Sequence, residues 1–207
     1  ALPTELTVFN RSMINLENEI NRLSSFNLNS AAVKELKSNI HYYKRGIIKT
    51  SQSSPELWYD EYELDFKINT DLIDEKSIFL INSKENSLKI SNYDLNNDFV
   101  KFYEFNSLTT LNSKHDLPFE LTINSDGNLN IERELIFHPL TDQINTVRSK
   151  IEMKVLGKDS DQISISLRHE NDKIAQNYLN QLISKFDQDG IYDRESEYRR
   201  TIEFVNK

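Results

Sequence analysis

The stretch 150–207 constrains the fold most, because two strand patterns lead directly into one long helical pattern. Apolar and polar residues alternate over 151–156 and again over 163–167, which is the period of a half-buried strand. From 171 to 186 apolar residues recur at spacings of three and four, as on one face of an amphipathic helix. Because each element has one apolar face, we expect these contacts: Ile163, Ile165 and Leu167 under Leu179, Leu182 and Phe186.

The helical pattern resumes past Gly190 with a seven-residue spacing set among charges. Its apolar members are Ile191, Tyr198, Ile202 and Val205, and Arg194, Arg199 and Arg200 interleave there with Glu195, Glu197 and Glu203. This pattern is equally typical of a solvated helix face with weak ion pairs and of the flank of a helix–helix seam. We expect the helix to continue beyond the globular body, and we expect the sequence to stop before the helix ends.

Composition narrows the class of protein. The chain has 207 residues, of which 37% are hydrophobic, so it can form one large domain or two small ones. The absence of cysteine excludes a disulfide scaffold and a thiolate metal site or nucleophile. A net charge of -8 without a basic stripe argues against a nucleic-acid partner. No window reaches the roughly 20 apolar residues of a membrane span, and residues 1–6 do not resemble a signal peptide, so we expect a soluble chain.

We interpret the chain as a single domain, 1–207, whose N-terminal region, 1–61, is helical. Apolar spacing predicts a helix beginning near Leu16, and the polar run 27–30 predicts a break after it. Ser30 is the expected N-cap of a second helix over 31–36. The segment 40–46 is expected to turn the chain.

The middle region, 62–138, is rich in strand patterns, and the C-terminal region, 139–207, begins with a helix. Strands are predicted at 62–68, 77–82, 87–93, 99–105, 119–123 and 129–137. Turn residues at 84–86 and 125–128 predict antiparallel hairpins, the second through Asp126-Gly127. The helix is expected near 142–149, with Thr141 as its cap and Ile144 and Val147 buried.

Candidate chemistry is sparse. Glu132 and Glu134 share one face of a strand and could form a carboxylate pair, although a solvated strand face is the commoner explanation. Ser, His and Asp occur without a nucleophile elbow, and the four glycines form no phosphate-binding loop. The histidines match no metal-ligand spacing: His41, His115, His138 and His169. We therefore expect no catalytic residue, no cofactor and no metal, and we expect His138 beside Pro139 to end a strand.

One aromatic run suggests a carbohydrate contact. Trp58, Tyr59 and Tyr62 follow Tyr42 and Tyr43, and such side chains can stack on sugar rings through their faces while their polar edges bind hydroxyls. Residues of this kind more often cover a hydrophobic core.

Short motifs near both ends carry a family resemblance. The C-terminal series is Ile151 to Val155, Ser160-Asp161 to Ser166-Leu167, Ala175, Leu179-Asn180, Leu182-Ile183, Phe186, Asp189 and Phe204-Val205. It resembles the end of the periplasmic region of Wzz-type polysaccharide chain-length determinants, closest to the bacterial tyrosine autokinases of capsule and exopolysaccharide export. The N-terminal series, similar to Bacteroidetes-like versions, is Leu16 to Ile20, His41-Tyr42-Tyr43, Gly46 and Ile48 to Ser51. The middle region matches only loosely.

The resemblance implies an α+β fold with a ferredoxin-like core, a mostly antiparallel sheet, a β-rich central insertion and a long C-terminal helix leading to the membrane. It implies a periplasmic domain of an inner-membrane protein, anchored through flanking helices absent from this chain. Two features depart from the family pattern. The first core strand is expected before Ala1, and the proline-rich stretch of some members is not seen by Lys207.

The implied function is that of a polysaccharide co-polymerase: a non-catalytic domain that regulates chain length and export of capsular or exopolysaccharide through homo-oligomer assembly. The expected partners are further copies of the chain, the polymerase and export machinery, and the polysaccharide itself. The full-length protein would be a tyrosine kinase only through a cytoplasmic domain outside these residues. We expect the oligomer contact at Arg194, Tyr198 and Ile202, next to the exposed end of the helix.

Two other classes of function remain open. A periplasmic carbohydrate-binding module would use Trp58, Tyr59 and Tyr62 as exposed glycan contacts, and the fluorescence of the single tryptophan would distinguish it. An enzyme would depend on Glu132 and Glu134 alone.

Overall fold

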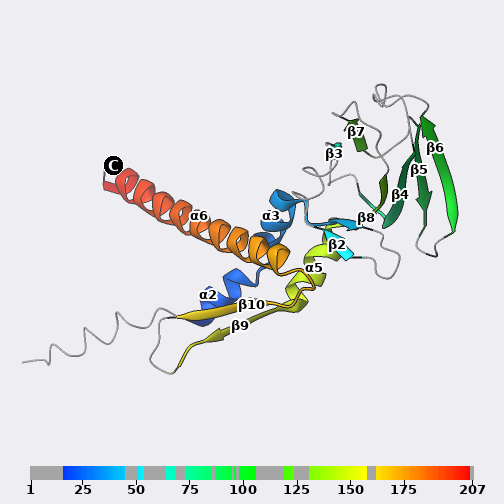
Figure 1. Ribbon diagram of the computed structural model, residues 1–207. Helices are drawn as coiled ribbons and strands as arrows, with labels where there is room; N and C mark the ends of the chain where they lie inside the picture. Colours follow the sequence, from blue (N-terminus) through cyan, green and yellow to red (C-terminus); the bar gives the residue numbers. More distant parts are fainter. Residues whose placement is uncertain are drawn as a thin grey trace, which may run out of the picture.

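The chain folds as an α+β protein with antiparallel sheets and a long helix at its C-terminal end (Figure 1). The computed structural model describes residues 16–44, 51–53, 64–68, 73–84, 87–94, 96, 98–105, 119–123, 131–157 and 162–205. Helices α3 (Phe26–Leu36) and α5 (Leu140–Lys150) lie between a large sheet and a β-hairpin (Figure 1). The α+β class and the mostly antiparallel sheet are confirmed, whereas the ferredoxin-like core stays a prediction.

The large sheet has six described strands in the order β2-β1-β8-β4-β5-β6, and every neighbouring pair is antiparallel. Four of these strands lie within 62–138, where the alternating patterns predicted them. The strands are β1 (Ile40–Lys44), β2 (Ser51–Ser53), β4 (Ser77–Lys84), β5 (Ser87–Tyr93), β6 (Phe99–Phe105) and β8 (Ile131–Phe137).

One predicted hairpin is wrong. Strand β7 (Phe119–Ile123) pairs with β3 (Leu64–Ile68), and β8 lies between β1 and β4, so β7 and β8 are not partners across the Asp126-Gly127 turn. Residues 124–130 are outside the described ranges of the chain. A turn signal favours a reversal but does not choose the neighbour. The buried Leu135 and Phe137 give β8 a central position with a strand on each side.

Three phenylalanine rings form the centre of the large sheet's core. Phe79 on β4, Phe119 on β7 and Phe137 on β8 have ring centroids 5.2, 5.2 and 5.6 Å apart, in tilted and edge-to-face arrangements. Their exposed fractions are 1%, 5% and 0%, respectively. These contacts bring β7, and with it the β3–β7 pair, to the core of the large sheet.

The N-terminal helices divide at a different point from the one predicted. Helix α2 (Leu16–Leu23) ends before Ser25, whose hydroxyl accepts a hydrogen bond from the Leu28 amide at 3.3 Å and caps α3. Ser30 therefore lies inside α3, not at its start. The polar run is helical because the buried Asn29 amide donates to the Leu23 and Ser25 carbonyls, at 2.9 and 2.8 Å, instead of opposing the helix.

The segment 40–46, expected to be a turn, contains strand β1, so the N-terminal region is not only helical. Ile40 and Tyr42 are 3% exposed and face Phe137 and Leu135 in the register with β8. Alternate residues, His41 and Tyr43, consequently lie on the other face of the sheet. This face is the one turned toward helices α3 and α5.

Helix α5 begins at Leu140, two residues earlier than predicted, with Pro139 at the N-cap and no side-chain cap bond. Thr141 is thus a helical residue and not the cap. Proline fixes a backbone φ compatible with this entry. Ile144 and Val147 are buried, as predicted, and β8 ends just before His138.

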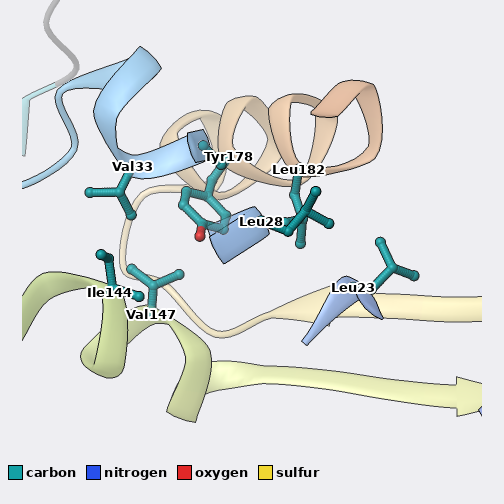
Figure 2. Packing of buried hydrophobic residues seen from close by; sticks show 8 residues of the cluster. Leu23, Leu28, Val33, Ile144, Val147, Tyr178 and Leu182 are labelled. Atoms are coloured by element: carbon teal, nitrogen blue, oxygen red, sulfur yellow. The ribbon is translucent and has the colours of Figure 1, made fainter. Parts of the chain in front are cut away.

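The C-terminal unit follows its predicted order: β9 (Ile151–Val155), β10 (Ile163–Leu167) and α6 (Asp172–Val205). Side chains from α2, α3, α5 and α6 form one buried group, the helix cluster (Figure 2): Leu23, Leu28, Ala32, Val33, Ile144, Val147, Tyr178 and Leu182. Ile163, Ile165, Leu167 and Phe186 pack against it, which confirms that α6 covers the hairpin. Leu179 is outside this cluster, and Tyr178 occupies the buried position instead.

Candidate functional site

A cleft of about 710 Å³ lies where β1 meets α3, α5 and the start of α6. Three stretches of chain that are distant in sequence line most of it: 35–43, 143–150 and 167–178. Gln52 of β2 completes one side. The described residues with polar side chains that line it are Glu35, Ser38, His41, Tyr42, Tyr43, Gln52, Gln143, Thr146, Lys150, Arg168, His169, Glu170, Asn177 and Tyr178.

Histidines converge at this cleft. His41 and His169 line it, and the ring of His138 lies 4.5 Å from that of His41. The pairing of β1 with β8 explains the second contact, because Ile40 lies opposite Phe137 and the His138 amide donates to the Asn39 carbonyl at 2.9 Å. The sequence spacing did not predict this group, because the three histidines are far apart in the chain: His41 lies on β1, and His138 and His169 lie just after β8 and β10.

All three rings are held in their neutral form. Burial, followed by the nearby rings of His138 and His169, lowers the pKa of His41 from 6.5 to about 4. Burial likewise lowers the pKa of His138 and His169, with Lys76 and Lys150 adding to the respective effects. The cleft therefore presents uncharged imidazoles at pH 7. Within the described ranges, no group of three or more His, Asp or Glu side chains is arranged to hold a metal ion.

Asn171 fixes one rim of the cleft. Its backbone N–H donates a hydrogen bond to His169 Nδ1 at 2.9 Å, so neutral His169 carries its proton on Nε2. Its side-chain oxygen accepts from the amides of Lys173 and Ile174, which caps α6. Its side-chain nitrogen donates to the Gln52 carbonyl at 3.3 Å. One residue thus joins the start of α6 to the large sheet.

Tyr43 lies on the same strand face as His41, with ring centroids 6.3 Å apart. Burial raises the pKa of the Tyr43 hydroxyl, and the carboxylates of Glu170 and Glu134 raise it further. The phenol is therefore protonated across the physiological range and can donate a hydrogen bond.

Helix α6 leaves the body near Asp193. Arg22 of α2 binds Asp189 at 3.0 Å and Asp193 at 3.1 Å, and its guanidinium lies 5.3 Å from the centre of the Phe186 ring. The hydrogen bond to Asp189 raises the pKa of Arg22. Beyond this point the described side chains from 191 to 204 are exposed, except for the half-buried Ser196. In Figure 1 this end of α6 projects away from the other elements.

The predicted oligomer contact lies on this projecting segment. Tyr198 is 70% exposed and Ile202 59% exposed, and Arg194 is exposed on the same side. Residues four apart are neighbours on a helix, so Arg194, Tyr198 and Ile202 form one continuous line. Ile191, 50% exposed, lies beside it. Together these four residues are called the α6 stripe below.

The other candidate residues are distributed elsewhere. Glu132 is exposed and Glu134 half-buried on β8, opposite Asn82 and Leu80 of β4, so the arrangement is that of a strand face. Trp58, Tyr59 and Tyr62 lie outside the described residues. Among the described helices, none is both long and apolar enough to span a bilayer.

Comparison with known proteins adds no family. No model of a known protein family matches the chain, and no curated protein matches it significantly.

Proposed function

We propose that this chain is a non-catalytic periplasmic domain of an inner-membrane polysaccharide co-polymerase, which regulates chain length and export of capsular or exopolysaccharide by homo-oligomer assembly. The observation that carries the proposal is the α6 stripe. Its apolar members are 50–70% exposed on a helix segment that has left the body. Apolar side chains gathered in this way are typical of a surface that another chain covers.

The length of α6 supports a role in assembly. A helix of 34 residues is about 50 Å long, and roughly its last 12 residues, about 18 Å, extend past the contact of Arg22 with Asp193. Copies anchored side by side in a membrane would have a high effective concentration, so a modest lateral interface would suffice. Both ends of the sequence resemble chain-length determinants, and we therefore propose that such an assembly regulates polysaccharide length and export.

The carbohydrate-binding alternative at Trp58, Tyr59 and Tyr62 has no support from the described residues, because these side chains are outside them. An enzyme using Glu132 and Glu134 is less well supported still. Neither carboxylate is among the described residues that line the cleft, and Glu132 is exposed to solvent on β8.

Charge reversal of Arg194 tests the proposal. In the membrane-anchored protein, Arg194→Glu should weaken assembly and change the length distribution of the polysaccharide, while the melting temperature of the isolated chain stays nearly the same because Arg194 is exposed. Lys154→Glu is the matched control, since this side chain is 74% exposed on β9 and the substitution changes net charge equally. Equal effects of both variants, or no effect of Arg194→Glu, would refute the contact.

A further inference from the structure

The cleft combines apolar surface with uncharged aromatic rings. Leu36, Val147 and Ile174 supply aliphatic walls, and His41 and Tyr43 present rings from one face of β1. A sugar ring has an apolar C–H face that packs against surfaces of this kind. A ligand that used this wall would have one apolar face and a polar edge.

The polar groups supply both donors and acceptors. Lys150 and Gln143 can donate, Glu35 and Glu170 accept, and hydroxyl groups of a ligand can do either. Ser38 also lines the cleft, but its hydroxyl oxygen is buried and has no hydrogen-bond partner among the described residues, so we assign it no contact with the ligand.

The charges of the lining cancel. It contains two acidic side chains, Glu35 and Glu170, and two basic ones, Lys150 and Arg168. Glu35 accepts from Lys185 at 3.4 Å, and Arg168 is paired with Glu152 on the outside. A ligand with net charge of either sign would face like charge in part of the cleft, which disfavours it.

We propose that this cleft binds a neutral saccharide of two or three rings. Its volume, about 710 Å³, lies within the roughly 300–1,000 Å³ of clefts that enclose small ligands. The choice of a saccharide among polyhydroxyl ligands rests on the proposed function. The cleft would then hold a segment of the glycan at the junction between the large sheet and the long helix.

Titration of the 207-residue chain by two-dimensional NMR with maltose, cellobiose and lactose tests the site. At least one of these neutral disaccharides should shift the amide signals of Tyr43, His169 and Asn177 at millimolar concentrations, while signals from the projecting end of α6 stay in place. Digalacturonate should bind more weakly, and p-hydroxybenzoate, a ring-bearing carboxylate without sugar hydroxyls, should not compete.

Two variants on α5 distinguish the cleft from its surroundings. Thr146→Trp should abolish binding because Thr146 is exposed on the cleft lining and the larger ring fills it, whereas Asn145→Trp, exposed on the same helix outside the lining, should not. Lys150→Met should weaken binding about tenfold through loss of a charged donor, and Lys154→Met should not. Unchanged melting temperatures establish that each variant is folded.

Absence of shifts with all three disaccharides, or equal binding by Thr146→Trp, would overturn the proposal. Tighter binding of digalacturonate would overturn the neutral assignment, and tighter binding of p-hydroxybenzoate the saccharide assignment. Assembly of the membrane-anchored protein is a separate readout. A chain that assembles without binding sugars refutes this site alone, and one that binds sugars without assembling refutes only the proposed function.

Discussion

At the scale of single residues, Leu182 links α6 to the rest of the helix cluster. It is 0% exposed and lies among side chains from α2, α3 and α5 (Figure 2). We expect Leu182→Ala to lower the free energy of unfolding by about 2–5 kcal/mol, because the removed methyl groups leave a cavity. Urea denaturation would measure this. Ile183→Ala, at a side chain that is 42% exposed, should cost much less. An unchanged urea midpoint for Leu182→Ala would exclude this packing.

His41 should make stability depend on pH. Its pKa is about 4 in the folded chain and near 6.5 when unfolded, so between these values the unfolded state binds more protons. The contribution of His41 to the free energy of unfolding is fully present above pH 6.5. It is lost as the pH falls from 6.5 to about 4, and the loss is about 3 kcal/mol at most. His138 and His169 act in the same direction.

The measurement is the urea midpoint of His41→Gln compared with the parent chain between pH 7 and pH 4. The substitution should flatten the dependence on pH, and His169→Gln should flatten it less because the ring of His169 is less affected by burial. Parallel curves for His41→Gln and the parent would contradict the buried neutral ring.

Individual residues were only partly predictable. Ile144, Val147 and Leu182 follow from apolar spacing, because a helix buries residues three and four apart. Tyr178 lies on the same predicted apolar face, but its partner could not be predicted, because its hydroxyl donates to Asn29 Oδ1 at 2.9 Å on a helix remote in the sequence. Asparagine is unfavourable inside a helix, so the sequence alone predicts a break at Asn29. The structure explains its helical position, because its side chain accepts from Tyr178 and donates to the Leu23 carbonyl.

At the scale of elements, the boundary between α2 and α3 offers a matched test. Ser25 caps α3 through its hydroxyl, whereas Ser30 is inside the helix. Ser25→Ala should therefore lower the free energy of unfolding by about 1 kcal/mol, and Ser30→Ala should leave it nearly unchanged, because alanine is favourable within a helix. Thermal and urea unfolding of both variants would measure this. The reverse order would restore the boundary predicted from the sequence.

Strands were more predictable than their partners. Period-two alternation located β4, β5, β6 and β7, because a half-buried strand must alternate. Pairing depends on which faces the core buries, so the Asp126-Gly127 turn did not reveal that β7 joins β3. Strand β1 was missed because Lys44, Arg45 and Gly46 made its end resemble a turn.

At the scale of the whole molecule, the described residues form two buried regions, and the cleft lies beside the second, with which it shares Val147 and Tyr178. One is the phenylalanine-centred core of the large sheet and the other is the helix cluster. The cleft could not be predicted, because its walls come from 35–43, 143–150 and 167–178, and only the fold brings these together. The α6 stripe, by contrast, lies within one helix, so its spacing of three and four residues was visible in the sequence.

We expect no hydrolysis, phosphate transfer or redox turnover from the chain. The sequence lacks cysteine and a phosphate-binding loop, and Glu132 and Glu134 lie on a strand face outside the cleft. Assays with glycoside, phosphate-ester and redox substrates would measure this. Glycosidase activity that is lost in Glu132→Gln or Glu134→Gln would overturn the expectation.

Assembly is the central claim, and the mass of the particle tests it most directly. Light scattering should find the isolated chain mostly monomeric in dilute solution, because without membrane helices its effective concentration is low. The membrane-anchored protein in nanodiscs should give a discrete homo-oligomer, and Arg194→Glu should shift it toward smaller particles. A monomeric membrane-anchored protein would contradict the account.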